Sequence, residues 1–166
     1  LVALMLNAAE EPRRQTLDPF DGIAGWVAAP SESVRLALSP AAGEKGGALR
    51  LDFDFQGHGG WAAARKAFPR VLPENWVFTL RLKGDAPPET LEFKLLDATG
   101  QNVWLSARRD FAFPRDWTTL SIRKRQGSFA WGPARGGDLR ELGFVEITVT
   151  AGTGGRGTVW IDELAL

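Results

Sequence analysis

Apolar and polar residues alternate with a period of two along most of this chain. A period of two places successive side chains on opposite faces of a strand, so each run predicts a strand with one buried face and one exposed face. The runs are Leu49–Phe55, Trp76–Leu82, Leu91–Leu95, Val103–Arg108, Thr118–Arg123, Phe144–Thr150 and Thr158–Leu166.

Turn-forming residues separate these runs. Glycine, often with proline, aspartate or threonine, clusters at 57–60, 84–88, 97–100 and 152–155, and such clusters mark tight turns. Strands that recur about every ten to fifteen residues are typical of an antiparallel sandwich and not of alternating strands and helices. The sequence therefore predicts an all-β fold, a β-sandwich of two antiparallel sheets.

Two segments are ambiguous. Trp61–Phe68 contains three consecutive alanines, but flanking glycines and the Phe68-Pro69 step favour a strand at an edge or with a bulge. Asp138–Leu142 is the other helical candidate, a single turn before Gly143.

Composition narrows the classes of partner. The 166 residues fit one domain, and 20 basic residues balance 20 acidic ones, so no net field attracts nucleic acid or anionic lipid. Cysteine is absent, which excludes disulfides, thiolate metal sites and cysteine catalysis. No run approaches the ~20 apolar residues that cross a membrane. We therefore expect neither a nucleic acid nor a membrane as partner.

The first residues differ from the rest. Residues 1–9 are apolar and end in small side chains, and residues 10–14 are polar, which is typical of the end of a secretory signal peptide. A short lead-in segment or the end of an upstream helix is the alternative. We therefore divide the chain into a signal-peptide remnant or lead-in segment at 1–16 and a sandwich domain at 17–166.

Catalytic groups are sparse. The single histidine, His58, lies in a glycine-rich turn that matches no phosphate-loop or dinucleotide pattern. Asp52 and Asp54 share the outward face of one strand, about 7 Å apart, which is near the carboxylate spacing of glycosidases. Alternating charge on an exposed strand face is common, so we expect no enzyme activity.

Seven tryptophans require an explanation. In Val103–Arg108 the aliphatic residues have the parity of the core, so Trp104 is predicted to point outward with Arg108. If Leu91–Leu95 pairs with this run, Glu92 and Lys94 share the same surface. An exposed ring beside charged donors and a carboxylate suits sugar stacking and hydrogen bonding. The remaining candidate ligand-binding residues are Arg81, if its strand joins this sheet, and Trp61 and Trp131 at the margins. The alternative is that a loop or a neighbouring domain covers Trp104.

Several motifs resemble the jelly-roll carbohydrate-binding modules of the galactose-binding-like superfamily, nearest to family 11 and its relatives. The resemblance covers 17–166, and the motifs that carry it are Phe20-Asp21-Gly22 with Trp26, Gly47–Phe53, Leu91–Leu95, Asn102-Val103-Trp104, Phe129–Pro133 and Gly157–Leu164.

The resemblance implies an antiparallel jelly-roll β-sandwich of two sheets. It implies a non-catalytic domain that recognises a poly- or oligosaccharide within a larger bacterial protein, secreted or periplasmic, attached to a catalytic or discoidin-type domain. The chain has no tyrosine, whereas β-glucan binders of the family use several, so their ligand does not carry over. The same scaffold also serves as a structural or protein-interaction domain without glycan affinity, which is the alternative function.

The resemblance also implies a structural calcium ion that joins the first loop to the last strand. Suitable oxygen donors are Asp21, the Gly22 carbonyl, Asp162 and Asp52, since calcium takes carboxylate and backbone carbonyl ligands. The alternative is that Asp162 caps a turn or pairs with an arginine and that Asp21 serves a tight turn.

Overall fold

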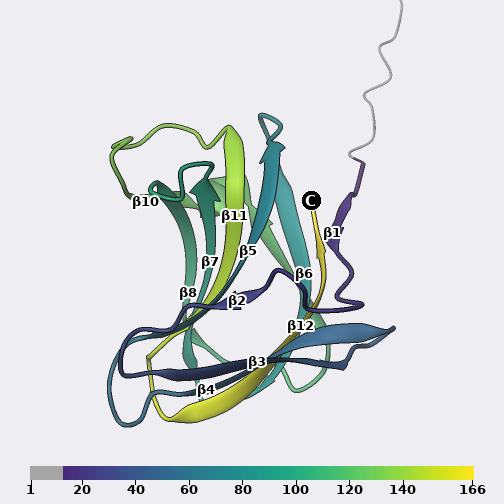
Figure 1. Ribbon diagram of the computed structural model, residues 1–166, viewed down its shortest axis with the longest axis vertical. Coiled ribbons are helices and arrows are strands. Elements are labelled where there is room, and N and C mark those ends of the chain that lie inside the picture. Colours follow the sequence, from purple (N-terminus) through teal and green to yellow (C-terminus); the bar gives the residue numbers. More distant parts are fainter. Residues whose placement is uncertain (1–12) are drawn as a thin grey trace, which may run out of the picture.

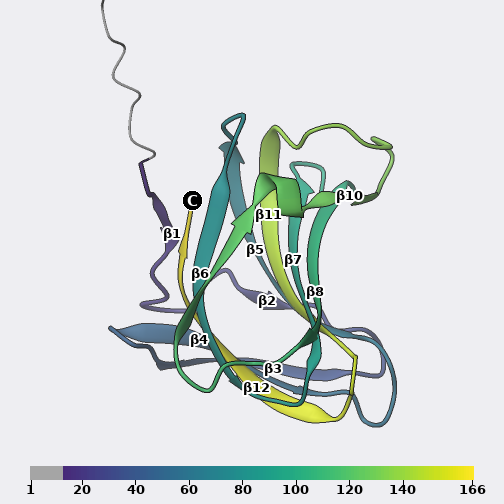
Figure 2. The same ribbon diagram turned by 180° about the vertical axis from the view of Figure 1, so that it is seen from behind.

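The structure, a computed structural model, describes residues 13–166 (Figures 1 and 2). Twelve strands form two antiparallel sheets of six strands each, and the only helical element among the described residues is the 3-10 turn η1 (Lys124–Gln126). The predicted signal-peptide tail at residues 1–9 lies outside the described residues.

Sheet A contains both ends of the described chain. Its strands follow the order β3 (Arg35–Ala42), β4 (Gly47–Asp54), β12 (Arg156–Ala165), β6 (Val77–Asp85) and β9 (Thr118–Arg123), and β1 (Thr16–Asp18) also pairs with β12. The first and last strands therefore lie side by side.

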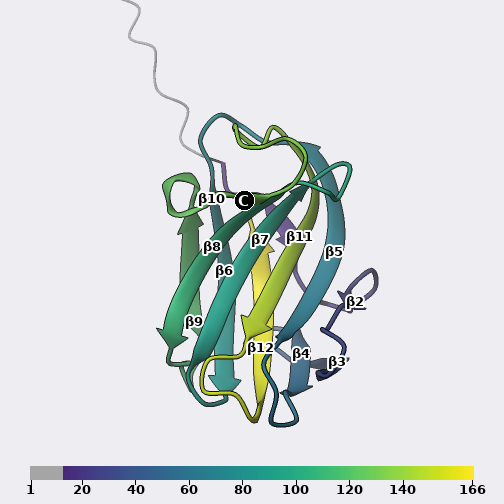
Figure 3. The same cartoon turned by 90° about the vertical axis from the view of Figure 1, so that its left-hand side faces the viewer.

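Sheet B stands in front of sheet A in Figure 3. Its strands follow the order β10 (Ser128–Trp131), β8 (Val103–Phe111), β7 (Glu89–Asp97), β11 (Glu141–Thr150), β5 (Trp61–Val71) and β2 (Val27–Ala28). Most neighbours in space are distant in sequence in both sheets, as in a jelly roll.

The core lies between the sheets and follows the predicted alternation. Alternate residues of the central strands, such as Leu49, Leu51 and Phe53 of β4 and Val145 and Ile147 of β11, are at most 3% exposed. Burying these aliphatic and aromatic faces supplies most of the free energy that opposes the entropy of the unfolded chain.

The ambiguous segment Trp61–Phe68 is the start of β5. Its pairing with β11 shifts register where Phe144 faces Ala67 and Leu142 faces Arg70, which is the predicted bulge. On its other side only Ala64 and Arg65 pair, with β2, so most of β5 is an edge.

The helical turn predicted at Asp138–Leu142 is wrong. β11 already begins at Glu141, and the Arg140 carbonyl accepts a hydrogen bond from the backbone N–H of Leu72 at 2.8 Å. A Cβ at Gly143 would lie 2.3 Å from the Asp97 carbonyl oxygen, so glycine here permits close approach of two strands and does not end a helix.

Candidate functional site

The outer face of sheet B carries a group of charged side chains beside exposed aromatic rings. In an antiparallel pair, directly opposed residues point to the same side of the sheet. Glu146 lies opposite Lys94 and Arg65, and Lys94 lies opposite Leu105. We call this surface the sheet B face; its outward side chains include Trp61, Arg65, Glu92, Lys94, Trp131, Phe144, Glu146 and Thr148.

A row of four charged side chains crosses the centre of this face. Arg65 donates from Nε to Glu146 Oε2 at 2.8 Å, and its Nη2 lies 2.6 Å from the same oxygen. Lys94 Nζ lies 3.2 Å from a carboxylate oxygen of Glu146 and 3.2 Å from one of Glu92. Two bases thus balance two acids, which compensates for the cost of burying Lys94 and Glu146.

Aromatic rings occupy two ends of the same face. Trp131 is 52% exposed at one edge of the sheet, and its ring centroid lies 5.6 Å from Lys94 Nζ. Trp61 is 47% exposed on β5, four strands away. Four strand spacings amount to about 19 Å, so the two indoles bracket a surface long enough for an extended ligand.

Trp104 does not belong to this face, contrary to the prediction that it shares a surface with Glu92 and Lys94. It lies opposite Leu95 and therefore points toward the inside of the sandwich. Its Nε1 donates to the Gly137 carbonyl at 2.9 Å, and its ring packs edge to face on Phe129. A loop residue, Gly137, therefore contacts Trp104 as the alternative expects, but the ring stays half-buried beside a cleft.

The orientation of Trp104 was predicted wrongly because this residue lies at the margin of the sandwich. Near this edge the inward side of β8 borders a cleft of about 440 Å³ that Trp76, Trp104 and Phe129 help to line. Both faces of β8 are consequently half-buried, and hydrophobicity no longer distinguishes inside from outside.

Arg108 also lies on the inward side, opposite Leu91. Its guanidinium donates to the Ser121 carbonyl of β9 at 2.9 Å, so it links the two sheets at this margin. Arg81 belongs to β6 in sheet A, where it contacts Glu44 and donates to Thr119 Oγ1 at 3.0 Å. The expectation that Arg81 joins the Trp104 strand in one sheet is therefore wrong.

Sequence reasoning found four residues of the sheet B face, Glu92, Lys94, Trp61 and Trp131, and missed others. Glu146 and Thr148 were accessible to prediction, because they alternate with Val145, Ile147 and Val149. Arg65 was hidden by the uncertain assignment of the alanine run before it.

The predicted calcium ligands separate into two groups. Asp162 is 1% exposed, and a Cβ at Gly43 would lie 2.5 Å from its Oδ2 and 2.2 Å from the Gly47 carbonyl oxygen. A Cβ at Gly46 would lie 3.3 Å from Asp21 Oδ1. The structure therefore gathers Asp21, Asp162 and the Gly43–Gly47 turn at the junction of the two chain ends.

Burial raises the pKa of Asp162, and the nearby charges of Glu163 and Asp21 raise it further, against hydrogen bonds from the backbone N–H groups of Glu163 and Glu44. No basic side chain among residues 13–166 pairs with Asp162. A buried carboxylate with acidic neighbours favours a bound cation.

Asp52 and Gly22 do not join this group. Asp52 binds Arg50 at 2.8 and 2.9 Å and accepts a bond from Thr158 Oγ1, and Thr158 is four residues before Asp162 along β12. Gly22 is exposed, and a Cβ added to it would have no atom within 4 Å. Within the described residues, no three His, Cys, Asp or Glu side chains gather as a metal site, so any ion here would depend on backbone carbonyls.

Solved structures with this architecture include several carbohydrate-binding modules. The family 11 carbohydrate-binding module from Clostridium thermocellum, solved with a β-1,3-1,4-mixed-linked tetrasaccharide, matches with a TM-score of 0.74 at 15% identity over 92% of this chain and 94% of that one. The family 30 module of a cellulosomal cellulase from the same organism gives 0.62 at 14% identity over 85% and 90%. A mannan-recognising module gives 0.55 at 12% identity over 93% and 97%.

The fold is that of a carbohydrate-binding module. The predicted antiparallel jelly-roll sandwich is therefore confirmed. No protein-family model matches the sequence, and no curated protein matches it. Identities of this size establish a shared fold and carry no ligand with them. Among the described residues, no helix is long and apolar enough to cross a membrane.

Proposed function

We propose that this chain is a non-catalytic carbohydrate-binding domain that holds a poly- or oligosaccharide on the sheet B face. The observation that carries the proposal is the pairing of two half-exposed indoles, Trp61 and Trp131, with a fixed row of charged groups between them. The sugar-bound family 11 module with the same fold supports it.

The chemistry follows from the arrangement of the face. Apolar sugar faces stack on the indoles, and hydroxyl groups exchange hydrogen bonds with Lys94, Glu92 and Arg65. Ion pairs hold these side chains in place before a ligand arrives, so little conformational entropy is lost on binding. Because two bases balance two acids, the face suits an uncharged sugar chain.

Affinity electrophoresis across a panel of neutral polysaccharides tests this function. At least one polysaccharide should retard the protein, and Trp131→Ala should migrate faster than the unaltered chain in that gel. Trp117→Ala is the matched control, since Trp117 is partly buried beside Lys83 of sheet A, away from the sheet B face. If no polysaccharide retards the protein, the structural or protein-interaction role replaces the proposal.

The attached domains and the cellular location that we expect follow from the same proposal. A sugar-binding domain places an attached catalytic or discoidin-type domain near its polysaccharide, and such polysaccharides lie outside the bacterial cytoplasm. We therefore propose a secreted or periplasmic bacterial protein. Sequencing the whole gene tests this expectation.

We also propose a structural calcium ion at the junction of the two chain ends. Asp21 and Asp162 would supply carboxylate oxygens, and the carbonyls of Phe20 and Gly47 lie beside the same turn. An ion there would bind only the folded chain and raise its melting temperature. Thermal melts with chelator and with millimolar calcium test it, and identical midpoints in both would refute the ion.

A further inference from the structure

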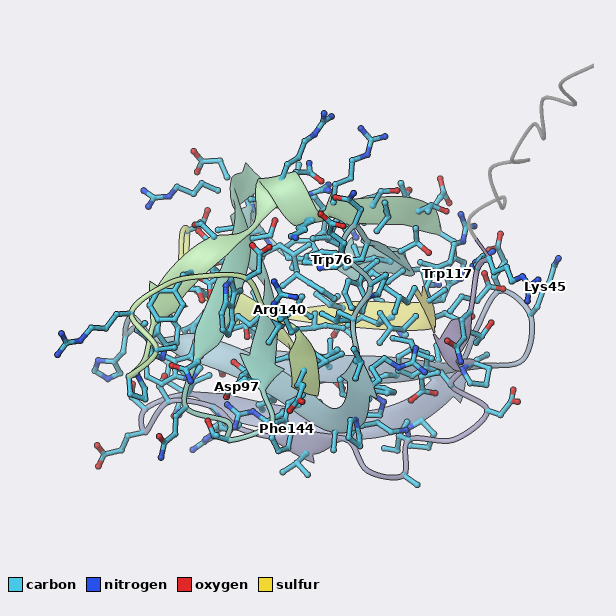
Figure 4. All side chains as sticks on the ribbon, turned by 90° about the horizontal axis from the view of Figure 1, so that it is seen from above. Lys45, Trp76, Asp97, Trp117, Arg140 and Phe144 are labelled. Atoms are coloured by element: carbon cyan, nitrogen blue, oxygen red, sulfur yellow. The ribbon has the colours of Figure 1, made fainter. Side chains whose placement is uncertain are left out.

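A cleft of about 1070 Å³ lies beside the outer side of sheet A. The lead-in to β1, the Gly43–Gly47 turn, the end of β5 and the start of β6 surround it. In Figures 1 and 2, β1, the end of β12 and β6 lie side by side at this place. Figure 4 shows Lys45 and Trp76, two of its lining residues, from above.

Basic side chains outnumber acidic ones around this cleft. It is lined by five basic residues, Arg13, Arg14, Lys45, Arg70 and Arg81, and by two glutamates, Glu44 and Glu163. Both glutamates already pair with arginines, Glu44 with Arg81 and Glu163 with Arg14. The lining side chains therefore retain a surplus of positive charge.

Two cations are available to a ligand. Lys45 is exposed and has no hydrogen-bond or ion-pair partner among residues 13–166. Arg70 donates at 3.0 Å to the neutral amide oxygen of Gln15 and pairs with no described carboxylate. A guanidinium and an ammonium beside one cleft attract an anion, and the planar guanidinium matches a carboxylate in two-point contact.

Apolar side chains line part of the cleft. Val71 and Val77 are 76% and 43% exposed, and they line it together with Trp76. Exposed aliphatic side chains beside unpaired cations suit a ligand that has both C–H faces and negative groups. Sugars that bear carboxylates have this combination.

We propose that this cleft is a second saccharide site, specific for chains that carry carboxylate groups, as uronic acids do. The saccharide part of the assignment rests on the proposed function, whereas the requirement for an anion rests on Lys45 and Arg70. The sheet B face, with its balanced charges, holds neutral chains, so one domain binds two chemically different glycans at two separate sites.

Isothermal titration calorimetry with trigalacturonate tests the proposal on the full chain, with a neutral trisaccharide and a sulfated one in parallel. Trigalacturonate should bind, with affinity that falls as salt rises. The double variant Lys45→Gln/Arg70→Gln should weaken the binding of trigalacturonate about tenfold or more, because each of the two substitutions removes a charge-assisted contact. Arg109→Gln/Arg156→Gln removes the same charge from exposed arginines outside the cleft lining and should leave binding unchanged.

Trp131→Ala should also leave trigalacturonate binding unchanged, whatever its effect on the binding of a neutral glycan. The two proposed sites are therefore tested independently of each other. Equal melting midpoints of both double variants show that they fold. The proposal is overturned if trigalacturonate does not bind, if the neutral or the sulfated trisaccharide binds as well or better, or if the two double variants behave alike.

Discussion

Charged side chains are paired with each other on the sheet B face, whereas some at the junction of the two chain ends lack ion-pair partners among residues 13–166. On the sheet B face Glu146 is buried between Arg65 and Lys94, and every charge in the row has a partner of opposite sign. At the junction of the two chain ends Asp162 is buried without a basic partner in the described chain, while Lys45 and Arg70, the latter from the end of β5, line an open cleft. The sheet B face therefore neutralises its charges internally, whereas the junction of the chain ends leaves both signs available to ligands.

Charged groups that stabilise the fold and charged groups that are free to bind a ligand thus lie in different regions of this domain. A paired, buried network fixes side chains and contributes rigidity, but it exerts little field at a distance. Unpaired charges at a cleft attract a ligand and are screened by salt.

The largest expected effect is the loss of Glu146. Glu146→Ala leaves Lys94, which is buried, with only Glu92 and deprives Arg65 of its partner. We expect the free energy of unfolding to fall by about 3 kcal/mol, because removing one member of a buried ion pair leaves an uncompensated charge. Urea unfolding measures it, and a loss below the error of extrapolation would show that the network is not stabilising.

Tryptophan variants of sheet B come next. Trp131→Ala should weaken binding of a retained neutral glycan by about 1–3 kcal/mol, as for other exposed aromatic anchors. Trp104→Ala should instead lower stability and leave affinity nearly unchanged, because this ring packs inside against Phe129. Parallel titration calorimetry and thermal melts separate the two roles, and equal affinity losses in both variants would contradict the assigned orientation.

The buried carboxylates predict a pH dependence of stability. Burial raises the pKa of Glu89, against hydrogen bonds from the N–H groups of Gly152 and Gly154, and it raises the pKa of Asp162. A carboxyl whose folded pKa exceeds its unfolded pKa binds its proton more tightly when folded. Its contribution to the free energy of unfolding is therefore complete at low pH, and this contribution is lost as pH rises through the pKa of the folded state.

With chelator present, Glu89→Gln and Asp162→Asn should each reduce the fall in stability of the chain as pH rises from weakly acidic to neutral. Asp162→Asn should also abolish any rise in melting temperature with calcium. Urea unfolding at several pH values measures the first effect, and a pH profile identical to that of the unaltered chain would contradict it.

The smallest effect concerns an exposed ion pair between the end of β6 and the loop that precedes β9. Arg115 and Asp85 lie 2.6 Å apart, but their side chains are 71% and 67% exposed. Asp85→Asn should change the free energy of unfolding by about 0.5 kcal/mol or less, because water and salt screen such pairs. An effect as large as that of Glu146→Ala would erase the distinction between buried and exposed pairs.

Alternation in the sequence was sufficient for the fold class and for most strands. Thr118–Arg123 matches β9 residue for residue, and the strand predicted at 144–150 lies within β11. β3 was missed, although Leu36 and Leu38 alternate there, since Pro40 and small residues weaken the pattern at this edge. Local sequence determines a strand where one of its faces is fully buried and the other is open to water.

Which residues share a surface depends on the pairing of strands in the folded chain. Most strands adjacent in space are distant in the chain, so the row of Arg65, Glu146 and Lys94 depends on pairings that alternation does not specify. Parity failed at Trp104 because β8 lies near the margin, where both faces are half-buried. The sequence by itself determined what each central strand buries, because burial follows a local period of two; register and sheet edges are global properties, and they determined what the molecule presents to a ligand.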